Sequence, residues 1–422
     1  MKGNGASKWV FRFTVITVFF TFCLIGLGGL VTSKGVGLAV HDWPTSFGYN
    51  MFLLPIDQWL GKFGVFEEHS HRLLASIVGL MTAVLASWLW VQEAKGKPRI
   101  IALMSILVTL GLMGVRTQAI FVIMAIAAVL IIVFSVYKII KNPNAMRWLA
   151  TMAYSMVIVQ GVLGGLRVTQ QNNQIGIIHG TLAQAFLVVL ALIALFCSNW
   201  WRKTRVANNP DERVPRVVRA HFLYATILVL LQLVIGASMR HQHAGLAAWD
   251  FPKAHGQWWP ATDQDSMARY NQGRAELQKK LYEDRKAFDS EGRPVIFLHS
   301  FREIQPGQIT LHMIHRLIAI LILGLVFGTI MVARKKLGGG HLLTKLALFW
   351  LGLVLVQILL GALTVLKYKP ADIATMHVLF GSLTLITGAL GVVICRNLHL
   401  PSLNEDSNGR DATKIEQVET AG

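Results

Sequence analysis

Long apolar segments recur along the whole chain, separated by short polar connections. Many of these segments exceed about 18 residues, which lets a helix cross the hydrocarbon core of a bilayer. One run, Ile100 to Lys141, would measure roughly 60 Å as a single helix, about twice that thickness, so we divide it into two helices with a turn near residues 116–118. The pattern predicts about ten spans, at residues 10–32, 67–91, 100–117, 119–140, 148–169, 176–199, 219–240, 310–333, 343–366 and 373–396.

Composition and charge agree with a multi-pass membrane protein. Hydrophobic residues make up 54% of the 422 residues and charged residues only 15%, whereas soluble proteins carry about 25% charged residues. The net charge of +18 resides mainly in short connections that alternate onto one side, as the positive-inside rule describes. We therefore read the charge as membrane orientation and not as nucleic-acid binding. We expect a plasma-membrane location with both termini cytoplasmic and residues 401–422 forming a polar cytoplasmic tail.

The chain contains an internal repeat. Three pairs of segments match in order: Gly37–Asp42 with Gly245–Asp250, His71-Arg72 with His315-Arg316, and Gln160 through His179 with Gln357 through His377. Four spans in each half correspond, and an even number of spans makes the halves parallel repeats. We place the first half at residues 1–206 and the second half at residues 207–400.

The two halves differ in length at one place. His71 and His179 are 46 residues further apart than His315 and His377, close to the length of a segment at about 100–141. We therefore predict an all-α polytopic membrane protein of two parallel-related four-helix bundles, with an extra helical hairpin inserted in the first half. The second half carries a long outer loop at about 241–308, in which residues 263–291 form a polar amphipathic pattern.

Four histidines occupy matched positions within the first turns of their spans. They are His71, His179, His315 and His377, and the orientation places all of them near the outer face. Polar residues inside a span are costly and indicate function, and two imidazoles across a helix bundle supply both axial ligands of a heme iron. Zinc fits less well because it usually takes three or four convergent ligands. The alternatives are that loop groups satisfy each histidine and that His312, one turn from His315, is the ligand in the second half.

Glu68 distinguishes the first half from the second. It lies three residues before His71, on the same helical face, where the second half has His312. A carboxylate there serves either as a proton relay or as a favourable charge at a helix N-terminus. Arg72 and Arg316 are expected to bind heme propionates or to extend toward the interface.

Together these motifs resemble the heme A synthase family. The matching residues are Glu68-x-x-His71-Arg72, Gln160-Gly-Val-Leu-Gly-Gly165, His179-Gly180, Asp250-Phe-Pro252, Gly256-Gln257, His315-Arg316 and His377. The resemblance implies an oxidoreductase that oxidises a methyl group of heme O to a formyl group, giving heme A. It implies that Glu68 is catalytic, that His71 and His179 bind the substrate heme iron, and that His315 and His377 bind the iron of a b-type heme that relays electrons.

The resemblance carries further expectations and two departures. We expect a heme O synthase to hand over heme O and an unnamed donor to supply electrons. We also consider that the chain forms a homo-oligomer. The family usually has eight spans, so the hairpin at 100–141 is unusual. Many bacterial relatives carry a cysteine pair in outer loops, whereas Cys23, Cys197 and Cys395 lie within or near spans here.

Two other functions compete with this reading. One is a non-catalytic membrane cytochrome b whose bis-histidine hemes carry electrons from quinol. The other is a heme carrier or chaperone without redox work. Glu68 favours the enzyme over the cytochrome b, because a protein that only carries electrons needs no acid beside just one of its two hemes. We also expect four further histidines, which lie in loops or at span edges, to be solvated: His69, His241, His243 and His299.

Overall fold

Helices dominate the computed structural model, which describes residues 8–114, 117–142, 145–203, 213–283 and 302–398. Nine helices in these residues are long and apolar enough to cross a membrane. They are α1 (Lys8–Ser33), α2 (Val65–Glu93), α4 (Gln118–Lys141), α5 (Met146–Gln170), α6 (Asn173–Cys197), α8 (Arg216–His241), α10 (Pro306–Leu337), α11 (Leu342–Leu366) and α12 (Ala371–Asn397). The tenth expected span corresponds to α3 (Lys97–Leu112), whose 16 residues are fewer than the about 20 that a span needs.

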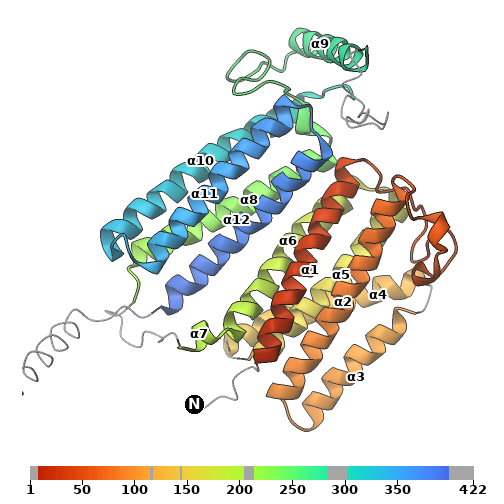
Figure 1. Cartoon of the computed structure of the whole chain (residues 1–422), viewed down its shortest axis with the longest axis vertical. Coiled ribbons are helices and arrows are strands. Elements are labelled where there is room, and N and C mark those ends of the chain that lie inside the picture. The colour runs from red at the N-terminus through yellow and green to blue at the C-terminus, as the bar shows by residue number, and fades with distance from the viewer. Residues whose placement is uncertain (1–7, 115–116, 143–144, 204–212, 284–301, 399–422) are drawn as a thin grey trace, which may run out of the picture.

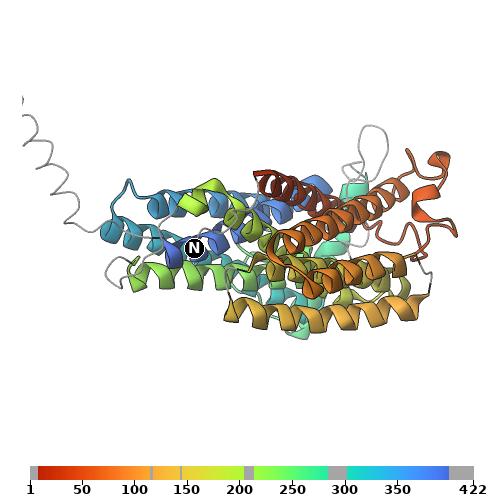
Figure 2. The ribbon, with the colours of Figure 1, turned by 90° about the horizontal axis from the view of Figure 1, so that it is seen from below.

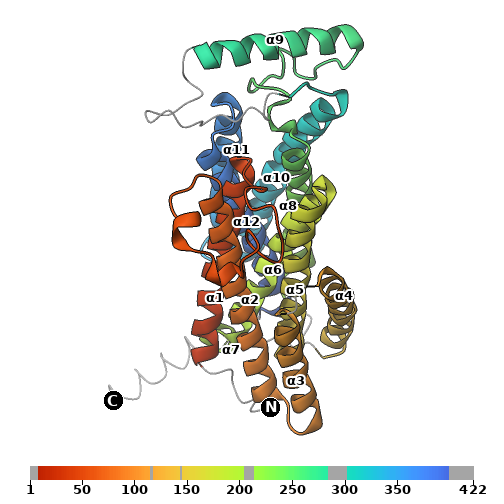
Figure 3. The same cartoon turned by 90° about the vertical axis from the view of Figure 1, so that its right-hand side faces the viewer.

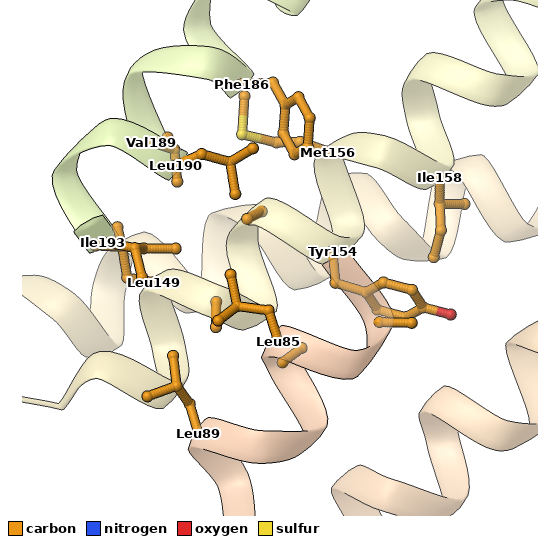
Figure 4. Packing of buried hydrophobic residues seen from close by; sticks show 14 of the residues in the cluster. Leu85, Leu89, Leu149, Tyr154, Met156, Ile158, Phe186, Val189, Leu190 and Ile193 are labelled. Atoms are coloured by element: carbon orange, nitrogen blue, oxygen red, sulfur yellow. The ribbon is translucent and has the colours of Figure 1, made fainter. Parts of the chain in front are cut away.

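The long helices form two bundles with separate cores (Figure 1). Helices α1, α2, α5 and α6 build the first bundle, and α8, α10, α11 and α12 build the second. In the first core, Leu85 and Leu89 of α2 pack with Leu149 of α5 and Leu190 of α6 (Figure 4). The all-α architecture of two four-helix bundles predicted from the sequence is thus confirmed.

The contact between the bundles follows the repeat. Helix α1 packs against α12, and its counterpart α8 packs against α6, the counterpart of α12. Helices α6 and α12 also contact each other at the centre. Two repeats related by a two-fold axis contact each other in this reciprocal way, and for parallel repeats the axis runs along the membrane normal. The boundary between 206 and 207 and the tail at 401–422 lie outside the described residues.

One end of the molecule carries both long loops and an extra helix. Helix α9 (Gln264–Glu283) lies across this end of the second bundle (Figure 3). Its Met267 and Tyr270 pack against Ala247 and Ala248 of the loop below. The amphipathic stretch expected at 263–291 is therefore helical as far as Glu283, and residues 284–301 are outside the described part.

The inserted hairpin lies on the first bundle (Figure 2). Helix α3 packs against α2, and α4 packs against α5. A hydrogen bond of 2.6 Å joins the hydroxyls of Thr109 on α3 and Tyr154 on α5. The hairpin thus widens the first bundle, whereas α10 and α11 of the second bundle are joined by a short turn.

Candidate functional site

The four matched histidines line one internal cavity of about 1120 Å³. His71 on α2 and His179 on α6 lie close enough to interact electrostatically, and so do His315 on α10 and His377 on α12. The structure therefore brings together the pairs that the repeat predicted, each pair within one bundle.

A glycine of a neighbouring helix faces each of these rings. The pairs are His71 with Gly28, His179 with Gly164, His315 with Gly236 and His377 with Gly361. A Cβ on any of these glycines would lie 3.0–3.4 Å from the nearest ring atom. A side chain there would push the ring from its place, so the glycines let the imidazoles lie close to the helix backbone.

Glutamines hold the helices that carry the histidines. Gln160 on α5 donates from Nε2 to the carbonyl oxygen of His179 at 3.0 Å, and Gln357 on α11 donates to that of His377 at 2.7 Å. Such bonds across helices fix their relative rotation in a medium that offers no water. The sequence marked both glutamines as part of the repeat but not their partners.

The imidazoles fit a heme iron by their free nitrogens. The Nδ1 atoms of His179, His315 and His377 are buried, and no group in the described residues hydrogen-bonds them. Loop groups therefore do not satisfy these atoms, contrary to the alternative considered from the sequence. His312 is buried too, and its Nδ1 likewise has no hydrogen-bond partner among the described residues, so the match of His315 to His71 in the repeat favours His315 as the candidate ligand.

Glu68 is buried beside the first pair and has defined partners. Its Oε2 accepts a hydrogen bond from the backbone N–H of Val40 at 2.9 Å, and its Oε1 accepts one from Arg72 at 2.8 Å. Among the described residues that line the cavity, Glu68 is the one carboxylate. The first half of the site therefore holds a fixed acidic group that the second half lacks.

Arg72 and Arg316, which follow His71 and His315, hold the loops after α1 and α8 in place. Arg72 donates to the carbonyl oxygens of Val40 at 2.6 Å, Asp42 at 2.7 Å and Thr45 at 3.0 Å. Arg316 makes the equivalent bonds in the second half, including one of 2.9 Å to the Asp250 carbonyl. We expected these side chains at propionates or at the interface, and the backbone carbonyls are partners that residue spacing does not reveal.

The loops bound by the two arginines have the same hydrogen-bond pattern. Asp42 accepts hydrogen bonds from the backbone N–H groups of Phe47 at 2.7 Å and Gly48 at 2.9 Å, and Asp250 accepts the same pair from His255 and Gly256. Burial raises the pKa of the Asp42 carboxyl, but the Gly48, Thr45 and Phe47 hydrogen bonds outweigh it and lower the pKa below its usual 3.8.

The prediction from the sequence was wrong for two histidines and did not identify several cationic side chains of the site. His69 and His241 are buried and not solvated, because the loop folds over the bundle end and places Trp59 against the His69 ring. Arg167, Arg240 and Lys369 line the cavity. Burial lowers the pKa of Lys369, in the loop between α11 and α12, to about 8. None of these three residues stands at matched positions of the repeat, so the repeat gave no signal for them.

The fold and site define a polytopic all-α membrane protein with paired histidines in its spans. The profile of the family described as "Cytochrome oxidase assembly protein" matches residues 116–388, which is more than half of the chain. The chain belongs to this family.

Curated relatives named "Heme A synthase" are similar to the chain. One from Shouchella clausii is 25% identical over 260 residues, which are 60% of this chain and 66% of the relative. One from Beijerinckia indica is 21% identical over 407 residues, 90% of each chain. One from Geobacillus kaustophilus is 31% identical over 251 residues, 58% of this chain and 59% of the relative.

Proposed function

We propose that this chain acts as a heme A synthase, an oxidoreductase that converts a methyl group of heme O to a formyl group. Family membership and the names of the relatives support heme A biosynthesis. The observation that carries the proposal is Glu68, the one carboxylate among the described residues that line the cavity.

Each histidine pair would hold one heme. His71 and His179 would bind the iron of the substrate heme O, and His315 and His377 would bind the iron of a b-type heme. Bound heme iron supplies the redox chemistry. The protein holds the rings against the facing glycines and fixes the helices through Gln160 and its counterpart Gln357.

Glu68 would act on protons at the first-half site. A positioned carboxylate can accept and deliver the protons that are transferred while the methyl carbon is oxidised. The Val40 N–H and the Arg72 guanidinium bond Glu68 and hold its carboxylate in one position beside the first histidine pair. The described lining of the second-half site holds no carboxylate, which suits a heme that only passes electrons from an external donor to the first half.

The proposal also covers the location and the partners of the protein. We place the protein in the plasma membrane with the basic connections and both termini cytoplasmic, so the heme sites lie toward the outer face. Heme O, an apolar substrate, would pass to this chain from a heme O synthase in the same bilayer. Homo-oligomerisation is part of the same hypothesis.

The test is heme extraction from a host that makes heme O but no heme A. Cells expressing the chain should contain heme A, identified by mass. Glu68→Gln should lower heme A formation by about 10²- to 10⁴-fold, the usual contribution of a general acid–base group, while a b-type heme stays bound. Glu67→Gln is the matched control, because Glu67 is also buried but bonds Lys34 and the Gly64 N–H instead.

Two results would contradict the proposal. Undiminished heme A formation by Glu68→Gln and Glu68→Ala would remove the catalytic assignment. Purified protein that contains heme B only, from cells that form no heme A, would favour a cytochrome b that carries electrons from quinol.

A further inference from the structure

The cavity is not symmetric between the halves. In the first half it extends to the inserted hairpin, where Leu110 of α3, Met113 and Gly114 of the turn after α3, and Phe121 and Met124 of α4 form part of its wall. Among the described residues the second half has no counterpart of α3 and α4, because a short turn joins α10 to α11. The hairpin therefore enlarges the lining of the site around His71 and His179.

A tryptophan connects the hairpin to the histidine helices. The Trp43 ring contacts Phe121 of α4 with centroids 4.7 Å apart. It lies so close to α5 that a Cβ on Gly165 would be 2.1 Å from ring carbons. In the repeat, Phe251 replaces Trp43 and Ala362 replaces Gly165, and the Phe251 side chain is 41% exposed. Phe251 also lines the cavity, so the halves differ in the size of this ring and in the contact of Trp43 with α4.

The wall that the hairpin adds is apolar. Leucine, methionine, glycine and phenylalanine contribute it, and the nearby Tyr154 hydroxyl already shares a hydrogen bond with Thr109. Pockets of this kind accept apolar ligand groups and exclude polar groups, which would lack hydrogen-bond partners there. Other positions of α3 and α4 expose large apolar residues such as Val108 and Ile123, as a lipid-facing surface does.

The two hemes of the proposed reaction differ in size, as the linings of the two halves do. Heme O carries a long isoprenoid tail, and a b-type heme carries none. We infer that the α3–α4 hairpin, together with Trp43, forms the binding site for the isoprenoid tail of the substrate heme. The inference rests on the proposed function, since that function assigns the tailed heme to the first half.

The experiment measures binding and needs no turnover. Purified protein that retains its second-half heme is titrated with heme O and, separately, with heme B. Leu110→Trp fills the tail site and should weaken heme O binding roughly tenfold, the effect of losing a few buried methylene contacts. Heme B binding to the first half should change less than about twofold, because heme B does not reach the hairpin. Val108→Trp, at an exposed position nearly opposite Leu110 around the same helix, should leave both unchanged.

The outcomes separate this inference from the proposed function. Equal weakening of heme O and heme B by Leu110→Trp, or unchanged heme O binding, would overturn the tail site even if the protein makes heme A. A tail-dependent difference in a protein that makes no heme A would support the tail site and leave the proposed reaction wrong. The absorption spectrum of the second-half heme reports whether each variant folds.

Discussion

Gln232 on α8 donates from Nε2 to the backbone carbonyl of His315 on α10 at 2.9 Å. In the repeat, Leu24 replaces Gln232, so α1 cannot donate the corresponding bond to His71. The second-half histidine helix is thus fixed by a neighbour that the first half lacks. A ligand that must keep one geometry, as in electron transfer, benefits from such a bond.

Gln232→Leu should therefore loosen the second-half site. Loss of one buried hydrogen bond costs about 0.5–1.5 kcal/mol, and the b-type heme should leave faster when the protein is diluted into an excess of a heme-scavenging protein. Leu231→Ala, at an exposed position of the same helix, is the control. Equal heme loss from both variants would show that the Gln232 bond does not support the site.

Arg72 and Arg316 allow the two halves to be disturbed separately. Arg72→Lys keeps the charge but cannot reach the carbonyls of Val40, Asp42 and Thr45 together. We expect lower heme A formation and faster proteolysis of the first outer loop, with the second-half heme spectrum unchanged. Arg316→Lys should alter that spectrum and leave the first loop protected. Identical effects of the two variants would mean that the loops do not act on separate sites.

Gly165 and Trp43 form the closest packing near the first-half site. Gly165→Ala places a methyl group where the Trp43 ring lies, and such overpacking costs about 1–3 kcal/mol. We expect a lower melting temperature and weaker heme O binding.

A double-mutant cycle checks the cause. Trp43→Ala in the Gly165→Ala background should remove the overpacking cost, giving a coupling energy between the two sites. Ala362→Gly, at the matching position of the second half, should cost only the about 0.5–1 kcal/mol of a helical glycine. Additive effects of Gly165→Ala and Trp43→Ala would contradict the contact.

The fold could be predicted from the sequence because a membrane allows few backbone structures. Apolar runs of span length leave only helices as a solution, and the repeat fixed which helices correspond. The short α3 was the exception. Its predicted span reached 117, but the helix ends at Leu112, where Gly111 and Gly114 weaken helix propensity.

The site followed from the sequence only where the repeat marked it. Matched positions gave His71, His179, His315 and His377 in the right pairs. Contacts that join a side chain to a distant backbone left no pattern, and so the Arg72 clamp was missed. The burial of His69 was missed for the same reason, since it depends on how the loop folds back over the helix end.

The first outer loop should depend on pH through Asp42. Its pKa is lowered in the folded protein because the Gly48, Thr45 and Phe47 hydrogen bonds outweigh burial, which acts in the opposite direction. The unfolded carboxyl thus binds protons at higher pH than the folded one, so its stabilising effect is complete above the usual value of 3.8 and is lost as pH falls through the lower folded pKa. Asp42→Asn should therefore lower the melting temperature at pH 7, and the difference from the unaltered protein should shrink below pH 3.8. Asp57→Asn, at an exposed position of the same loop, should leave the melting temperature unchanged at both pH values. A difference for Asp42→Asn that persists undiminished in acid would show that the Asp42 charge does not hold the loop.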